Sequence, residues 1–127
     1  MPPIRVLVVD DDAAIRALIT TTLSGEGLEV FEAGGGGAAL DIVTSTHPDV
    51  VVLDSDMPAM TGWEVADLLR ANPATTAIRT IVLTSQSPGR PGVVSLPAGV
   101  DACLRKPFDS HELVAAVKQL AAPNRRR

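Results

Sequence analysis

The feature that most constrains this chain is a regular alternation of short apolar runs with segments of helical periodicity. The apolar runs predict strands over residues 4–9, 28–33, 49–53, 79–83 and 102–105. The other segments predict helices over residues 13–24, 38–45, 63–71 and 109–121. Strands that alternate with helices form parallel sheets that are covered on both faces through right-handed crossovers. We therefore predict an α/β fold, with a doubly wound five-stranded parallel sheet in the flavodoxin-like order 2-1-3-4-5.

One part of this alternation is irregular. A helix is expected between the fourth and fifth strands, but residues 87–98 read SPGRPGVVSLPA. Proline costs about 3 kcal/mol and glycine about 1 kcal/mol in the interior of a helix. We therefore predict a weak or irregular fourth helix, which is short, displaced or absent.

The first and last helices carry more detailed predictions. In the last helix, Asp109 followed by Glu112 predicts a capping box at the N-terminus. In the first helix, the apolar residues Ile15, Leu18, Ile19 and Leu23 recur at helical spacing, and Gly25 follows as a stop signal.

Polar side chains follow four of the predicted strands, and phosphate chemistry could use them. The first strand is followed by Asp10, Asp11 and Asp12, the third by Asp54, the fourth by Thr84 and the fifth by Lys106. The carboxyl ends of parallel strands share one edge of the sheet, where open α/β sheets bind ligands. In the predicted order the first and third strands flank the crevice at that edge. The topology and the carboxylates therefore indicate the same place.

Carboxylates gathered at that edge would repel one another. At ~4 Å the repulsion is several kcal/mol per pair at an effective dielectric constant of about 20. Such clusters are tolerated when a divalent cation or a proton lies among them, and oxygen ligands without His or Cys favour Mg²⁺. Neither His47 nor His111 lies at the carboxyl end of a predicted strand, so neither is expected to be a ligand.

The hydroxyl of Thr84 and the ammonium of Lys106 are donors suited to phosphoryl oxygens. A carboxylate can itself be the nucleophile and become an aspartyl phosphate. Metal, carboxylate, hydroxyl and lysine together indicate a phosphoryl-transfer site, where positioning and charge neutralisation do most of the catalysis. Taken singly, each residue is also explained as a cap, a turn or ordinary surface, so the hypothesis depends on the whole set.

Composition argues against several other classes of protein. A hydrophobic content of 46% with 20% charged residues argues against disorder. With a net charge of −4, no basic face and few aromatic residues, this domain is not expected to bind nucleic acid. No apolar run approaches the ~20 residues of a membrane helix, so no membrane association is expected. Cys103 is the single cysteine, which favours a cytoplasmic location over a disulfide-stabilised fold.

Four motifs contain these strand ends: VLVVDDD, VVLDSDMPAMTGWE, IVLTSQ and CLRKPF. In this order, they resemble the receiver domain of two-component response regulators over residues 4–121. The resemblance implies a receiver domain at 1–121, followed at 122–127 by a basic tail or the start of a linker. It also implies Mg²⁺ as cofactor and a sensor histidine kinase or histidine phosphotransfer protein as partner. The sequence does not identify the output partner or domain.

The resemblance implies roles for the acidic residues. Asp54 is similar to the phosphoacceptor, and Asp11 is similar to a direct Mg²⁺ ligand. Asp10 resembles a ligand that acts mainly through a metal-bound water, and Asp56 occupies the place that supplies a backbone carbonyl. The implied metal set is therefore Asp10, Asp11, Asp54 and Asp56, while Asp12 is expected to cap the first helix.

The resemblance also implies how the site is read out. Thr84 is similar to the switch hydroxyl that moves toward the phosphoryl group. Lys106 is similar to the lysine that forms a salt bridge with that phosphoryl group. Pro107 resembles the family proline that follows a cis peptide bond. Cys103 departs from the family, which often has an aromatic residue there whose ring rotates inward on activation. The acceptor side therefore matches the family, whereas the readout side does not.

The predicted function is a receiver that accepts a phosphoryl group on Asp54 and switches conformation to signal. It would catalyse only its own phosphorylation and dephosphorylation, so it is not expected to be an ordinary enzyme. One alternative is a vestigial receiver that acts only as an interaction domain, which the complete residue set argues against. The other is a Mg²⁺-dependent phosphohydrolase with Asp54 as nucleophile and Asp56 as acid and base, which would need a cap domain or substrate pocket.

Overall fold

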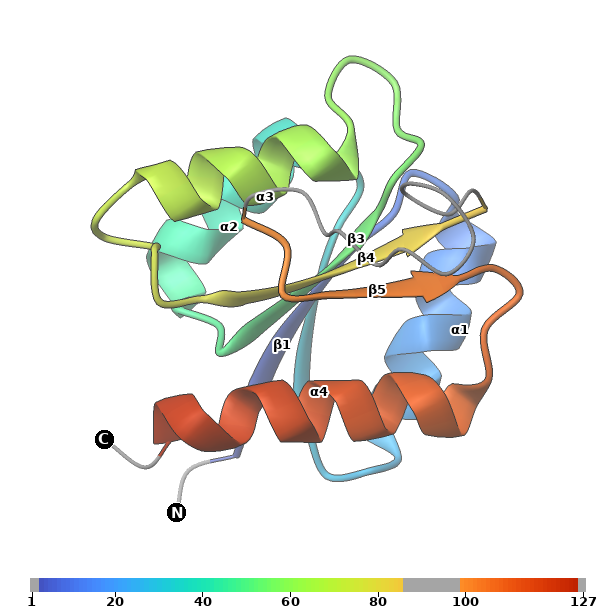
Figure 1. Ribbon diagram of the computed structural model, residues 1–127. Helices are drawn as coiled ribbons and strands as arrows, with labels where there is room; N and C mark the ends of the chain where they lie inside the picture. Colours follow the sequence, from blue (N-terminus) through green and yellow to red (C-terminus); the bar gives the residue numbers. More distant parts are fainter. Residues whose placement is uncertain (1–2, 86–98, 126–127) are drawn as a thin grey trace, which may run out of the picture.

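The computed structural model describes residues 3–85 and 99–125, with side chains as far as residue 121. Within these residues the chain forms five strands and four helices (Figure 1). In chain order they are β1 (Arg5–Val9), α1 (Ala13–Ser24), β2 (Glu29–Ala33), α2 (Gly36–Thr46), β3 (Val50–Asp54), α3 (Gly62–Ala71), β4 (Arg79–Thr84), β5 (Ala102–Arg105) and α4 (Ser110–Arg125).

The five strands form one parallel sheet in the order β2-β1-β3-β4-β5, which confirms the predicted fold class. Helices α2 and α3 cover one face of the sheet, and α1 and α4 cover the other (Figure 1). Val9 pairs with Leu53 in the ladder between β1 and β3, and Asp54 pairs with Leu83 in the ladder between β3 and β4. The strands that lead into Asp10 and Asp54 are therefore neighbours that end side by side.

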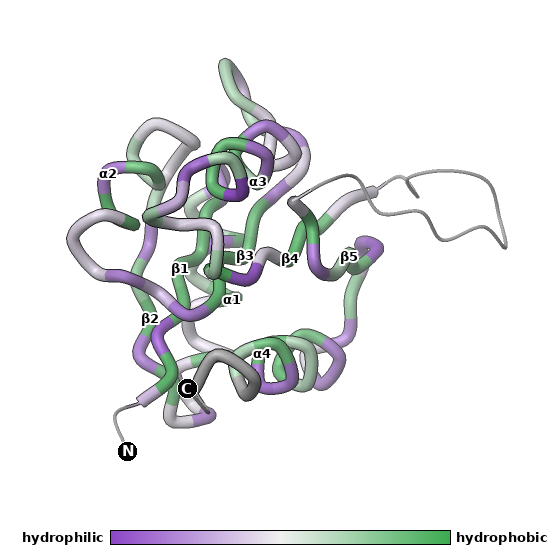
Figure 2. The backbone as a smooth tube through the Cα atoms, turned by 60° about the vertical axis from the view of Figure 1, so that its left-hand side comes forward, coloured by the Kyte–Doolittle hydropathy of each residue, from purple (hydrophilic) through white to green (hydrophobic). Residues whose placement is uncertain are grey.

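The central strands are buried on both faces because helices cover both sides of the sheet. In β1, Leu7 and Val9 belong to the hydrophobic cluster on the side of α2 and α3. Val6 and Val8 belong to the cluster on the side of α1 and α4. Figure 2 shows these inner strands as largely hydrophobic segments. Continuous apolar runs are typical of parallel strands in this position, which is why the sequence predicted them.

The four apolar residues that recur at helical spacing in α1 do not all face the core. Ile19 and Leu23 are buried, but Ile15 is 36% exposed and Leu18 is 65% exposed. An α-helix turns about 100° per residue, so Leu23 lies about 40° from Ile19 and both can face the sheet. Leu18 lies about 100° from Ile19 in the opposite direction, which turns its side chain toward solvent.

The helix ends also differ in part from the predictions. Asp12 caps α1 as predicted, and Asp109 Oδ1 accepts a hydrogen bond from the backbone N–H of His111 at 2.8 Å. Helix α4 extends to Arg125 rather than ending at residue 121. Pro123 lies within this helix, where its missing N–H removes one backbone hydrogen bond without ending the helix. Whether 122–127 is a separate tail or linker stays a prediction.

The predicted irregular helix at 87–98 lies outside the described residues. The helix labelled α4 in Figure 1 is the one that follows β5. Among the residues that the structure describes, none of the helices has the length and apolar character required to span a membrane.

Candidate functional site

Three carboxylates meet where β1 and β3 end. One oxygen each of Asp10, Asp11 and Asp54 lies within 4.8 Å of the other two. Asp10 and Asp54 are buried, with exposed fractions of 1% and 4%, whereas Asp11 is exposed. The structure thus brings together three of the four predicted metal ligands, of which Asp11 is the one open to solvent.

Asp10 is held in place but is not neutralised. Its Oδ1 accepts a hydrogen bond from the backbone N–H of Asp12 at 2.9 Å, and its backbone carbonyl accepts one from Arg16 Nη1 at 2.7 Å. No described residue donates a hydrogen bond to Asp10 Oδ2, although this atom is buried. Burial raises the pKa of Asp10, the hydrogen bond from Asp12 opposes the rise, and the charge of Asp54 adds to it.

The orphaned oxygen of Asp10 tests whether a metal fits here. A buried carboxylate oxygen normally has a partner, and one without a donor is explained when a cation supplies the missing positive charge. The side chains that gather here offer only carboxylate oxygens, which is the ligand chemistry of Mg²⁺. Asp10, Asp11 and Asp54 therefore fit the predicted metal.

Lys106 contacts Asp54 directly. Its Nζ lies 2.6 Å from Asp54 Oδ1, a short charge-assisted contact between residues 52 positions apart. The backbone N–H of Lys106 donates to the carbonyl oxygen of Thr84 at 2.8 Å, which joins the end of β4 to the end of β5. Thr84 is buried at that end, so the predicted hydroxyl and ammonium come from neighbouring strand ends.

Two other predictions at this edge can be compared with the structure. The side chain of Asp56 is not part of the carboxylate group, and its backbone N–H makes a long hydrogen bond of 3.4 Å to Asp54 Oδ1. The role predicted for Asp56 uses its backbone carbonyl, and that role stays a prediction. The peptide bond between Lys106 and Pro107 is cis, as the resemblance implied.

Cys103 lies in the middle of β5, where it pairs with Val82 of β4. Its side chain is partly buried, and burial raises the pKa of the thiol. Burial thus favours the neutral thiol, and the cysteine packs as a small, weakly polar side chain in the edge strand.

The sequence reasoning missed Gly62, the first residue of α3. A Cβ at this position would lie 2.4 Å from the backbone carbonyl oxygen of Asp54, so only glycine allows α3 to begin this close to the acceptor. The preceding Thr61 forms a capping box with Glu64, which was also missed. The pattern Thr61-Gly-Trp-Glu64 was the available signal, since it combines a helix N-cap with a residue that lacks a side chain.

Arg16 of α1 was missed as well. Besides its contact to the carbonyl of Asp10, its Nε lies 3.1 Å from Glu32 Oε1 at the end of β2. It thus ties α1 to the ends of two strands. A single arginine on a predicted helix gave no signal for this role.

The family model of the response regulator receiver domain matches residues 6–118. The response regulator MprA of Mycolicibacterium vanbaalenii is 42% identical over 118 residues, which are 93% of this chain and 50% of that protein. The DNA-binding response regulator MtrA of Mycobacterium tuberculosis is 39% identical over 114 residues, which are 90% of this chain and 49% of that protein.

Among solved structures, the receiver domain of the Francisella response regulator 1452 superposes with a TM-score of 0.84 at 30% identity. The superposition covers 97% of this chain and 99% of that one. The chain spans about half the length of the curated relatives it matches. The matched residues include β1 from Val6 onward, the other four strands, and all four of the predicted acidic site residues. The chain belongs to the response regulator receiver domain family of two-component systems.

Proposed function

We propose that this receiver accepts a phosphoryl group on Asp54 in a Mg²⁺-dependent reaction. The observation that carries the proposal is the arrangement around Asp54, whose Oδ1 lies 2.6 Å from Lys106 Nζ while two further carboxylates lie within 4.8 Å. A carboxylate between an ammonium and a cation site is placed where an incoming phosphoryl group finds positive charge on two sides. Its position at the sheet edge keeps it within reach of a donor.

The transfer forms one bond and breaks one. An oxygen of Asp54 bonds to phosphorus while the bond from phosphorus to the donor breaks. With a phosphohistidine donor the leaving group is the imidazole, which takes up a proton, and with acetyl phosphate it is acetate. Mg²⁺ bound by Asp10, Asp11, Asp54 and the carbonyl of Asp56 would neutralise the phosphoryl oxygens. Lys106, whose Nζ lies 2.6 Å from Asp54 Oδ1, would donate to them as well.

The readout would begin with Thr84 and Lys106. A backbone hydrogen bond of 2.8 Å joins the two residues, so a movement of one strand end would shift the other. A phosphoryl group on Asp54 offers new acceptors to the Thr84 hydroxyl, and this differential contact favours the active conformation. The output partner or domain receives that change, in the cytoplasm to which a chain with a single cysteine is suited.

A protein donor needs a surface next to Asp54. Ile15 and Leu18 of α1 are exposed and, with Phe108, line a groove beside Lys106. Exposed apolar side chains grouped in a groove are typical of protein interaction sites. We infer that the sensor histidine kinase or phosphotransfer protein docks here, with its phosphohistidine over the sheet edge.

The test is labelling by acetyl phosphate with Mg²⁺, read by intact mass. The wild type should gain one phosphoryl group, and Asp54→Ala should gain none. Asp67→Ala, which changes an exposed aspartate of α3, is the matched control and should label like the wild type.

Three other results would overturn the proposal. Equal labelling of the wild type and Asp54→Ala would place the acceptor elsewhere. A wild type that takes up no phosphoryl group would favour the vestigial receiver. Multiple turnovers of a phosphomonoester would favour the phosphohydrolase.

A further inference from the structure

The position of Lys106 depends on β5, the short strand that precedes it. Lys106 follows the strand directly, and its Nζ lies 2.6 Å from Asp54 Oδ1, yet β5 has only four residues and lies at the edge of the sheet. An edge strand is hydrogen-bonded along one side only, and short edge strands are easily displaced. A slip of one residue would move Lys106 by about 3.3 Å and turn its side chain to the other face of the sheet. The register of β5 therefore decides whether the ion pair forms.

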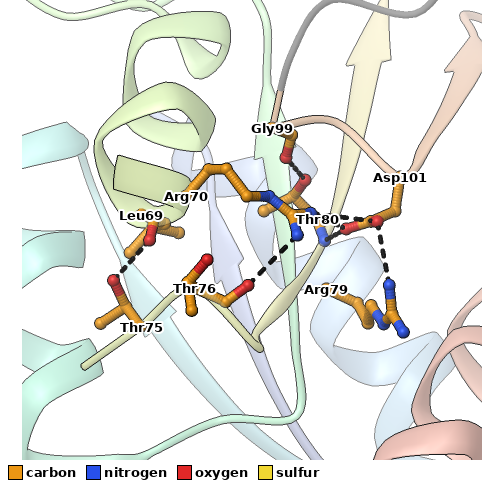
Figure 3. Close-up of polar contacts among 8 residues, drawn as sticks. All are labelled: Leu69, Arg70, Thr75, Thr76, Arg79, Thr80, Gly99 and Asp101. Atoms are coloured by element: carbon orange, nitrogen blue, oxygen red, sulfur yellow. Dashed lines mark hydrogen bonds and ion pairs between the residues drawn. The ribbon is translucent and has the colours of Figure 1, made fainter. Parts of the chain in front are cut away.

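The residue before β5, Asp101, is bound to β4 by both its backbone and its side chain (Figure 3). Its backbone N–H donates to the carbonyl of Thr80 at 3.0 Å, and its Oδ2 accepts from the backbone N–H of Thr80 at 2.9 Å. Arg70 Nη2 lies 3.1 Å from each carboxylate oxygen, and Arg79 Nη1 lies 3.3 Å from Oδ1. Asp101 is thus bonded to the first two residues of β4 and to an arginine near the end of α3.

A second contact holds the chain two residues earlier. The Thr80 hydroxyl donates to the carbonyl of Gly99 (Figure 3). Gly99 has a φ of +88°, and a Cβ there would lie 2.8 Å from the carbonyl oxygen of Ala66 on α3. The segment from Gly99 to Asp101 therefore packs closely against α3 and is hydrogen-bonded to β4. It lies at the end of the sheet opposite the carboxylates.

These contacts are more than an exposed ion pair. The side chain of Asp101 is 13% exposed, and its two oxygens accept from two guanidinium groups and a backbone N–H. The side chains of Arg70 and Arg79 are 37% and 33% exposed, but charge-assisted hydrogen bonds to a carboxylate this buried are stronger than those of a fully exposed pair. Arg70 reaches Asp101 from a different element, so the carboxylate fixes β5 relative to α3 as well as to β4.

We propose that Asp101 is a positioning residue for the phosphoryl-transfer site, because it sets the register of β5 and so places Lys106 against Asp54. The proposal rests on the proposed function of Asp54. From Asp101 to Lys106 the extended chain covers about 16 Å, and a strand cannot shorten or lengthen appreciably over that distance. The anchor at one end of β5 and the hydrogen bond from Lys106 N to Thr84 O at the other define the position of the ammonium.

The experiment compares Asp101→Asn with Glu29→Gln. Glu29 is an ion-paired carboxylate at the start of β2, which is the other edge strand, so it is a matched control. Two rates are measured on the full chain: labelling of Asp54 by acetyl phosphate with saturating Mg²⁺, and alkylation of Cys103, the single cysteine and a native probe of β5. We expect Asp101→Asn to slow labelling about tenfold and to speed alkylation, with Mg²⁺ affinity unchanged. Glu29→Gln should change neither rate.

A second comparison separates positioning from general stability. In a Lys106→Ala background, Asp101→Asn should change the labelling rate by less than about twofold, because the two residues act through the same contact. An equal loss in both backgrounds would overturn the proposal, as would faster alkylation with unchanged labelling. Should Asp101→Asn fail to fold, Arg70→Gln removes the guanidinium that contacts both carboxylate oxygens, and it is expected to act in the same direction.

The two proposals fail in different ways. A wild type that takes up no phosphoryl group would overturn the function proposed for Asp54. Unchanged alkylation of Cys103 in Asp101→Asn would overturn the register role, whatever the labelling result.

Discussion

The substitution Asp10→Asn should stabilise the metal-free domain at neutral pH while weakening Mg²⁺ binding. Asp10 is 1% exposed, and no described residue donates to its Oδ2. Two unit charges 4.8 Å apart repel by about 3.5 kcal/mol at an effective dielectric constant of about 20. The exposure of Asp11 and the charge of Lys106 reduce the net repulsion. We therefore expect a gain of about 1–3 kcal/mol in the free energy of unfolding.

The pH dependence follows from the pKa of Asp10, which burial raises above its usual value. The unfolded chain releases this proton at a lower pH than the folded chain does. The wild type therefore loses stability as the pH rises from the usual carboxyl pKa through the raised one, and the loss is complete above it. Since Asp10→Asn carries no such proton, its advantage over the wild type should be full at neutral pH and should vanish in acid.

Urea unfolding followed by the fluorescence of Trp63 measures these differences, in EDTA and in excess Mg²⁺. A ligand at about 100 times its Kd adds about 2.7 kcal/mol to the stability of a folded state that alone binds it. Mg²⁺ should therefore stabilise the wild type to about this degree and the variant much less. Asp41→Asn, which changes an exposed aspartate of α2, should behave as the wild type does. If Asp10→Asn is less stable than the wild type in EDTA at neutral pH, Asp10 is a structural partner and the reasoning is wrong.

Three further outcomes are expected. Gly62→Ala should lower the free energy of unfolding by about 1–3 kcal/mol, because the added Cβ would clash with Asp54. Gly37→Ala is the control and should not lower it, because a Cβ there meets nothing within 4 Å. Similar urea midpoints for the two variants would contradict this. Ala59 has a φ of 68°, so Ala59→Gly should stabilise by about 1 kcal/mol, and a lower urea midpoint would refute that. Leu18→Ala should slow transfer from any phosphohistidine protein that labels the wild type, but not labelling by acetyl phosphate; Leu68→Ala is the control, and slowing with both donors would argue against a docking role.

The order of the elements and the place of the site were predictable because both depend on local pattern and general topology. A buried parallel strand must be apolar on both faces, so Val6–Val9 and Val50–Leu53 stand out in the sequence. Strand ends in a parallel sheet share one edge, which placed Asp10 and Asp54 together before any distance was known. Residue chemistry also placed the ammonium of Lys106 at this edge, whereas the cis bond before Pro107 was reached only by resemblance to the family.

Several features depended on contacts between residues that are distant in the sequence. The apolar spacing of α1 could not show that Leu18 faces solvent, because the direction in which a helix presents its surface is set by the elements it packs against. Gly62 is required because a Cβ at this position would lie 2.4 Å from the carbonyl oxygen of Asp54, eight residues earlier.

The contacts of Asp101 make the same point at longer range. They come from Arg70, Arg79 and Thr80, on an earlier helix and on the neighbouring strand. The sequence by itself thus determined the fold class and which side chains gather at the sheet edge, because periodicity and strand order are properties of the chain. Only the tertiary structure decided how closely they approach and what holds them there, because hydrogen bonds and steric contacts act over ångströms in space whatever the separation along the chain.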